Sequence, residues 1–104
     1  MSQQACKLII VTEKVLLREV TRIIDAAGAT GYTVMAASGR GSRNTRSSGQ
    51  PAVSDTFTNV KLEVITTNDT LARQIADQIA GKYFGNYSGI AYLESIEVLH
   101  AHSL

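Results

Sequence analysis

The sequence is poor in cysteine and proline, contains no tryptophan and carries almost no net charge. Its one cysteine, Cys6, cannot form an internal disulfide, which excludes the disulfide-rich secreted domains. We interpret Cys6 as a small apolar residue leading into a strand; the alternative is a redox role. A formal net charge of +1 excludes bulk attraction to nucleic acid or lipid, so any positive patch must be local.

A long apolar run is also missing at the N-terminus, where residues 8–11 form an apolar stretch of only four residues. A secretory signal needs a longer stretch, and a membrane-spanning helix needs about 20 apolar residues. Hydrophobic residues make up 44% of the chain and charged residues 18%, which is typical of a globular protein. We therefore expect a cytoplasmic protein with a single domain that covers residues 1–104.

The spacing of apolar residues predicts six elements. Continuous or alternating apolar patterns predict strands at 7–13, 32–36, 59–67 and 90–99. Apolar stripes predict a helix that starts near Lys14 and ends at Gly28, and a second one that Asn68 or Asp69 caps and that ends near Gly85. This order predicts an α+β fold, the ferredoxin-like βαββαβ sandwich, with a four-stranded antiparallel sheet and two helices on one face.

The last predicted strand is apolar on both faces, although helices can cover only one of them. One side carries Ile90, Tyr92, Ile96 and Val98, and the other Ala91, Leu93 and Leu99. An uncovered apolar face predicts self-association. The alternative is an alternation blurred because the strand lies at the edge of the sheet.

Residues 38–58 form a connection far longer than a hairpin needs, and such loops are usually functional or disordered. The loop contains Arg40, Arg43 and Arg46 at steps of three, against a single acid, Asp55. Arginine forks, glycine backbone and hydroxyl groups together favour an anion-binding cradle. The alternative is a solvated, flexible basic loop.

Patterns for other chemistry are weak. The sequence has no motif of paired carboxylates, no Ser-His-Asp signature and no cysteine spacing for a metal, so we expect no catalytic residues and no metal site. His100 and His102 leave a metal-binding protein as an alternative. The first and third strands lack aromatic residues for stacking bases, which argues against nucleic-acid binding.

Four segments resemble the PII-like signalling proteins, especially the cyanobacterial SbtB type that partners a sodium-dependent bicarbonate transporter. They are residues 12–14, 27–33, 39–46 and 89–90. The resemblance implies a homotrimer that binds cyclic AMP, AMP, ADP or ATP in clefts between subunits, with Mg or Ca as a companion of ATP. It also implies that the long loop, called the T-loop (about 38–58), regulates the transporter, with peripheral association at the membrane.

Carried over to this sequence, the resemblance implies two groups of site residues. The expected nucleotide-binding residues are Gly41, Ser42, Arg43, Arg46, Tyr87, Gly89 and Ile90. Gly89 and Ile90 would act from the adjacent subunit. The expected partner-binding residues of the T-loop are Arg40, Asn44, Thr45, Ser47 and Ser48.

Two alternative functions stay open: slow hydrolysis of ATP or ADP, for which Asp55 could orient water, and a metal-binding trimer of the same fold. Many relatives carry a C-terminal Cys-Gly-Pro-x-Gly-Cys pattern that this sequence lacks. We therefore do not expect redox control or hydrolysis that depends on this pattern.

Overall fold

The computed structural model describes residues 2–38 and 58–102. Its elements follow the predicted order, with a short 3-10 turn, η1, before the first helix. They are β1 (Gln3–Glu13), η1 (Lys14–Leu16), α1 (Leu17–Ala26), β2 (Thr33–Ala37), β3 (Asn59–Thr66), α2 (Asp69–Tyr83) and β4 (Gly89–Val98).

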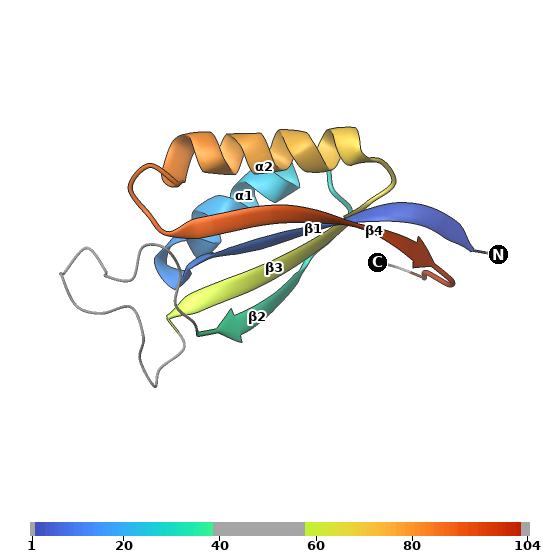
Figure 1. Cartoon of the computed structure of the whole chain (residues 1–104), viewed down its shortest axis with the longest axis horizontal. Helices are drawn as coiled ribbons and strands as arrows, with labels where there is room; N and C mark the ends of the chain where they lie inside the picture. Colours follow the sequence, from blue (N-terminus) through green and yellow to red (C-terminus); the bar gives the residue numbers. More distant parts are fainter. Residues whose placement is uncertain (1, 39–57, 103–104) are drawn as a thin grey trace.

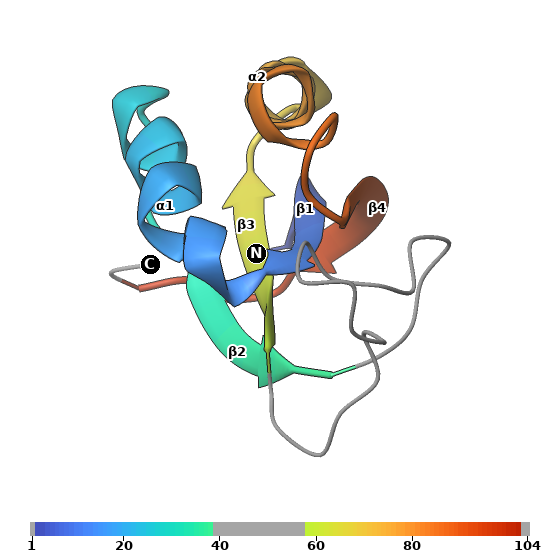
Figure 2. The same cartoon turned by 90° about the vertical axis from the view of Figure 1, so that its left-hand side faces the viewer.

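The strands form one antiparallel sheet in the order β2-β3-β1-β4 (Figure 1). Both helices lie on the same side of this sheet, as the end-on view in Figure 2 shows. The arrangement confirms the predicted ferredoxin-like fold. We call the side of the sheet without helices the open face.

The core lies between the sheet and the helices. Strand alternation brings Leu8 and Ile10 of β1 to the same side as Leu62 of β3, and all three are fully buried. Val20 and Ile24 of α1 are equally buried. The remaining buried apolar residues of this cluster are Leu16, Val60, Val64, Ala72, Ile75 and Ile79. The predicted apolar stripes therefore face the core, and their removal from water stabilises the fold.

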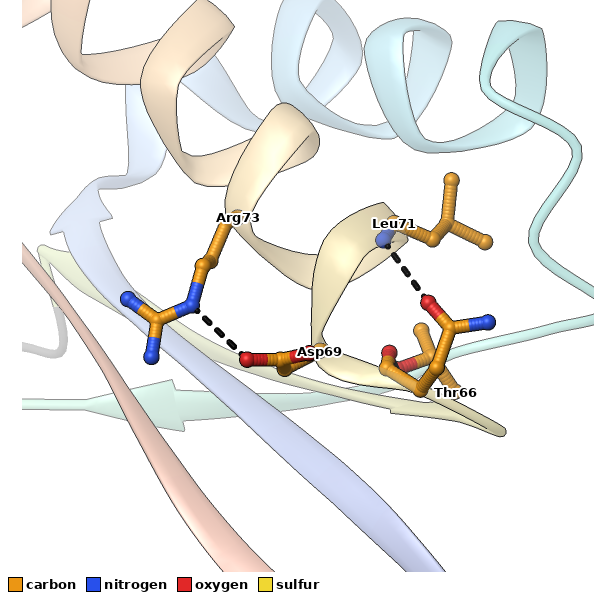
Figure 3. Close-up of polar contacts among 5 residues, drawn as sticks. Thr66, Asp69, Leu71 and Arg73 are labelled. Carbon is orange, nitrogen blue, oxygen red and sulfur yellow. Dashed lines mark hydrogen bonds and ion pairs between the residues drawn. The ribbon is translucent and has the colours of Figure 1, made fainter.

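The helix ends use the predicted signals. Gly28 has a φ of +89°, the left-handed conformation that glycine adopts readily, just after α1. The Asn68 side chain accepts a hydrogen bond of 3.2 Å from the backbone N–H of Leu71 and so caps α2 (Figure 3). One turn on, Arg73 Nε lies 3.1 Å from Asp69 Oδ2. This exposed pair adds little to stability.

The limits of β2, β3 and β4 lie within one residue of the prediction, whereas two other boundaries differ by three residues or more. The segment after β1 forms the 3-10 turn η1 first, so α1 begins at Leu17 and not near Lys14. β1 begins at Gln3, four residues earlier than expected from residue 7, because β4 continues past the end of β3 and Val98 pairs with Gln3. The polar Gln3 and Gln4 gave no strand signal in the sequence.

The last strand is apolar on both faces, as predicted. Ala91 and Leu93 pack against the core, while Ile90 and Tyr92 lie on the open face with 56% and 41% of their surface exposed. Leu99 lies just beyond the end of β4 and is also exposed. Within residues 2–38 and 58–102, no helix is both long and apolar enough to cross a membrane.

Candidate functional site

The candidate site lies at one end of the sheet, where β1 and β2 end and β3 and β4 begin. Register places Glu13 and Ala37 beside Asn59, and Thr12 beside Gly89. The turn between α2 and β4 therefore lies at the same end of the sheet as the two strand ends that flank the T-loop (Figure 1). We call this region the loop end.

Two consecutive residues of β1 hold the turn in place through the backbone of Ser88. The Thr12 hydroxyl donates a hydrogen bond of 2.7 Å to the Ser88 carbonyl oxygen. The Ser88 N–H donates one of 2.8 Å to Oε2 of Glu13. Thr12, which makes the first bond, is only 2% exposed. The second bond is made to a carboxylate, and a hydrogen bond to an ionised carboxylate is stronger than one between neutral groups. We call these two bonds the Ser88 clamp.

Gly89 follows the clamp at a position where no side chain fits. A Cβ atom at Gly89 would overlap the ring of Phe84. The Phe84 ring is partly buried against the core, so it has little freedom to move away. The first residue of β4 must therefore be glycine if the ring is to keep its place.

The rest of the turn is anchored to the end of α2. The backbone N–H groups of Asn86 and Tyr87 both donate to the carbonyl oxygen of Tyr83, at 3.1 and 2.9 Å. The rings of Tyr83 and Tyr87 meet edge to face with centroids 6.5 Å apart. The turn is thus fixed from both sides, by α2 and by β1.

A backbone contact fixes the other part of the loop end. The Lys14 N–H of η1 donates a hydrogen bond of 2.8 Å to the carbonyl oxygen of Thr58, the residue before β3. This bond joins η1 to the strand that follows the T-loop. The side chain of Lys14 is exposed and adds a positive charge beside it.

A separate open groove of about 670 Å³ lies along η1 and α1 and reaches the edge strand β2. Apolar Val15 and Val34 and basic Lys14 and Arg18 are among its lining residues. None of the predicted site residues that the structure describes is among its lining residues.

The structure describes three of the predicted nucleotide-binding residues. Tyr87 and Gly89 belong to the clamped turn, and Ile90 follows them with its side chain on the open face, level with Val11. The other predicted residues lie outside the described residues: Gly41, Ser42, Arg43, Arg46, Arg40, Asn44, Thr45, Ser47 and Ser48.

Sequence reasoning assigned no role to the residues that position the turn, Thr12, Glu13 and Phe84. The only signal was the resemblance of residues 12–14 to the PII-like pattern. Among the described residues, no three His, Cys, Asp or Glu side chains gather as they would to hold a metal ion.

Comparisons with known proteins agree with this architecture. Residues 5–103 match the family model of the nitrogen regulatory protein P-II. A PII-like signalling protein from Thermus thermophilus is 30% identical, with a TM-score of 0.71 over 93% of this chain and 90% of that one. The fold and the match together define the class, and the chain belongs to the P-II family of regulatory proteins.

More distant structures share the fold. CPII from Thiomonas intermedia, bound to ADP, AMP and acetate, is 21% identical with a TM-score of 0.76, covering 96% of this chain and 93% of that one. A GlnK–ATP complex from B. subtilis is 18% identical with a TM-score of 0.61, covering 92% and 84%.

Proposed function

We propose that this chain is a PII-like signalling protein that binds adenine nucleotides at the loop end, in clefts between the subunits of a homotrimer. The expected ligands are cyclic AMP, AMP, ADP and ATP, the last with Mg or Ca. The protein acts in the cytoplasm and controls a partner through its T-loop.

The observation that carries this proposal is the clamped turn at the loop end. Three predicted nucleotide-binding residues, Tyr87, Gly89 and Ile90, lie in or directly after a turn that β1 and α2 hold rigidly. A site whose backbone is already fixed loses little entropy when a ligand binds. The same end of the sheet carries both strand ends that flank the arginine-rich T-loop, which supplies the expected phosphate ligands.

The structural relatives support adenine nucleotides as the ligands. CPII was solved with ADP and AMP, and the B. subtilis GlnK with ATP. All these ligands share an adenine ring and at least one phosphate. A site that recognises both features therefore accepts several of them in competition, as a sensor requires.

For the partner, we propose a sodium-dependent bicarbonate transporter, with peripheral association at the membrane when the two are bound. The resemblance of residues 39–46 to the SbtB type supports this choice. A CPII structure with ADP, AMP and bicarbonate adds a second link to inorganic carbon, although that protein is only 22% identical.

The open face supports the homotrimer. It exposes Met35, Ile65, Ile90 and Tyr92, each with 38% or more of its surface in water. Burial of these side chains against other copies would stabilise the assembly. A cyclic arrangement buries the same surface on every copy and closes on itself.

Isothermal titration calorimetry with cyclic AMP, AMP, ADP and ATP, with and without Mg or Ca, tests the proposal. We expect micromolar binding with one site per subunit. If none of the four nucleotides binds, the sensor function is wrong and the T-loop acts only as a protein-contact element. Release of phosphate from ATP by the purified protein would instead support the hydrolase alternative.

A further inference from the structure

The open face carries charges within its apolar surface. Lys7 of β1 lies between two carboxylates, with its Nζ atom 3.6 Å from Oε1 of Glu94 and 3.9 Å from Oε2 of Glu63. Lys7 and Glu63 are largely shielded, with 25% and 27% of their side chains exposed, whereas Glu94 on the edge strand β4 is 52% exposed. One cation therefore serves two anions, and the exposed Glu94 carries the surplus negative charge.

A second cation on the same face has no such partner. Lys61 of β3 lies level with Val11 on the open face and is half-buried. It makes no ion pair with any residue in the described part of the chain. A half-buried lysine beside Met35 and Val11 is poorly placed to stay unpaired once this face is covered.

Lys61 and Glu94 cannot satisfy each other within one chain. β1 separates β3 from β4, which puts their backbones about 10 Å apart across the sheet. Lys61 is level with Ile90, four residues from Glu94 along β4, which adds about 13 Å along the strands. The combined separation of about 16 Å is too great for an ion pair.

We infer that Glu94 of one copy pairs with Lys61 of the neighbouring copy across the interface of the homotrimer. This inference rests on the homotrimer of the proposed function. Contacts in a closed ring are head to tail, so residues on the β4 side of one copy can meet the β3 side of the next. The surplus anion and the unpaired cation lie on these two sides, and their charges are opposite.

The surroundings make this pair matter for assembly. Apolar side chains flank both charges and would exclude water from the interface. Ion pairs in such a setting act more strongly than those in water, and an unpaired charge buried there is costly. The pair therefore fixes which edges meet, while the apolar residues supply most of the burial.

Charge exchange tests the inference. Lys61→Glu and Glu94→Lys each place like charges opposite one another, whereas the double variant restores an opposite pair with its order reversed. We expect each single variant to raise the subunit concentration at half-assembly by about tenfold or more. We expect the double variant to recover most of this loss. Mass photometry or light scattering over a dilution series measures both effects.

Controls separate assembly from folding. Arg22→Glu makes the same change of charge on the exposed side of α1 and should leave assembly unchanged. Circular dichroism checks that each variant is folded. If Lys61→Glu does not fold, Lys61→Met takes its place, because it removes the positive charge without adding a negative one. The lost Lys7–Glu94 contact is not restored in the double variant, so recovery of assembly must come from contact between copies.

The outcomes distinguish this inference from the proposed function. If both single variants assemble like the unaltered protein, or if the double variant shows no recovery, the inference is wrong and the homotrimer stands. If the unaltered protein is monomeric but binds ADP, the inference and the homotrimer both fail, and nucleotide binding stands. Loss by each single change with recovery in the double variant confirms the pair.

Discussion

Gly89 and Phe84 are five positions apart, and together they set the shape of the turn before β4. The ring of Phe84 occupies the space that any side chain at position 89 would need. Other glycines in the described chain lack this constraint: a Cβ at Gly81 on α2 would point into open space. The two glycines therefore provide a matched test of whether the turn depends on this close approach.

We expect Gly89→Ala to destabilise the protein by about 1–3 kcal/mol, because the added methyl group forces the Phe84 ring out of its packing. Nucleotide affinity should fall at the same time, since the turn would shift. Urea unfolding and calorimetry measure the two effects. The control, Gly81→Ala, should stabilise the protein by about 0.5–1 kcal/mol, because alanine favours the helix. Equal effects of the two variants would contradict the role given to Gly89.

Arg46→Ala should weaken the binding of every adenine nucleotide by about tenfold or more, because it removes a charge-assisted contact to phosphate. The loss should be similar for AMP and ATP if Arg46 holds the phosphate that they share. Calorimetry measures the affinities, with Arg22→Ala on α1 as the control. Unchanged affinity would show that Arg46 is not a phosphate ligand.

At the scale of single residues, the sequence allowed us to predict Gly89 as a site residue. It did not reveal the contacts that hold the turn in place. Resemblance singled out Tyr87, Gly89 and Ile90 by local pattern. The Ser88 clamp joins residues 75 and 76 positions apart, and no short-range pattern reports such a contact. Thr12 and Glu13 attracted attention only because residues 12–14 resemble the PII-like pattern.

At the scale of secondary-structure elements, α2 shows how residues close together in the sequence determine where a helix begins. Asn68 lies in extended conformation, and its side chain accepts the N–H of Leu71, one of the donors that a helix leaves unpaired at its start. The Thr66 hydroxyl donates a hydrogen bond of 2.6 Å to the Asn68 carbonyl oxygen and fixes the approach from β3. These contacts lie at the end of α2 away from the candidate site.

We expect Asn68→Ala to lower the free energy of unfolding by about 1 kcal/mol, because one N–H at the start of α2 loses its partner. Nucleotide affinity should be unchanged, since the cap is remote from the loop end. Gln74→Ala, at an exposed position within α2, is the control and should have little effect. If the free energy of unfolding in urea is the same for Asn68→Ala as for the unaltered protein, water replaces the cap without loss of stability.

Periodicity predicted both helices and all four strands, but it misplaced the starts of β1 and α1 by three residues or more. The apolar stripe that each helix turns toward the core depends only on residues close together in the sequence, so the sequence pattern revealed it. The extension of β1 to Gln3 depends on backbone pairing with Val98 at the far end of the chain. Backbone hydrogen bonds of this kind require no apolar residue, so polar Gln3 and Gln4 gave no sign of them.

At the scale of the whole molecule, the open face is the surface through which the proposed homotrimer would assemble. Ile65 of β3 is 48% exposed on that face, level with Lys7. In an isolated subunit, a polar residue there would cost little. In the proposed homotrimer, the same position is covered by another copy.

We therefore expect Ile65→Asp to reduce a trimer to monomers while the subunit stays folded, because assembly would bury an added charge. Light scattering measures the mass, and circular dichroism checks the fold. Val15→Asp is the matched control, since Val15 is 70% exposed but belongs to η1 and not to the open face. A trimer that tolerates Ile65→Asp would place the interface elsewhere.

The Ser88 clamp has a consequence for the order of events during synthesis. Its β1 residues, Thr12 and Glu13, emerge from the ribosome early, whereas Ser88 emerges when most of the chain has been made. Contacts between such distant residues form slowly and only after long loops have closed. The loop end of the sheet is therefore completed late, and a subunit interrupted before β4 carries the arginine-rich loop without the backbone turn that we expect to face the nucleotide.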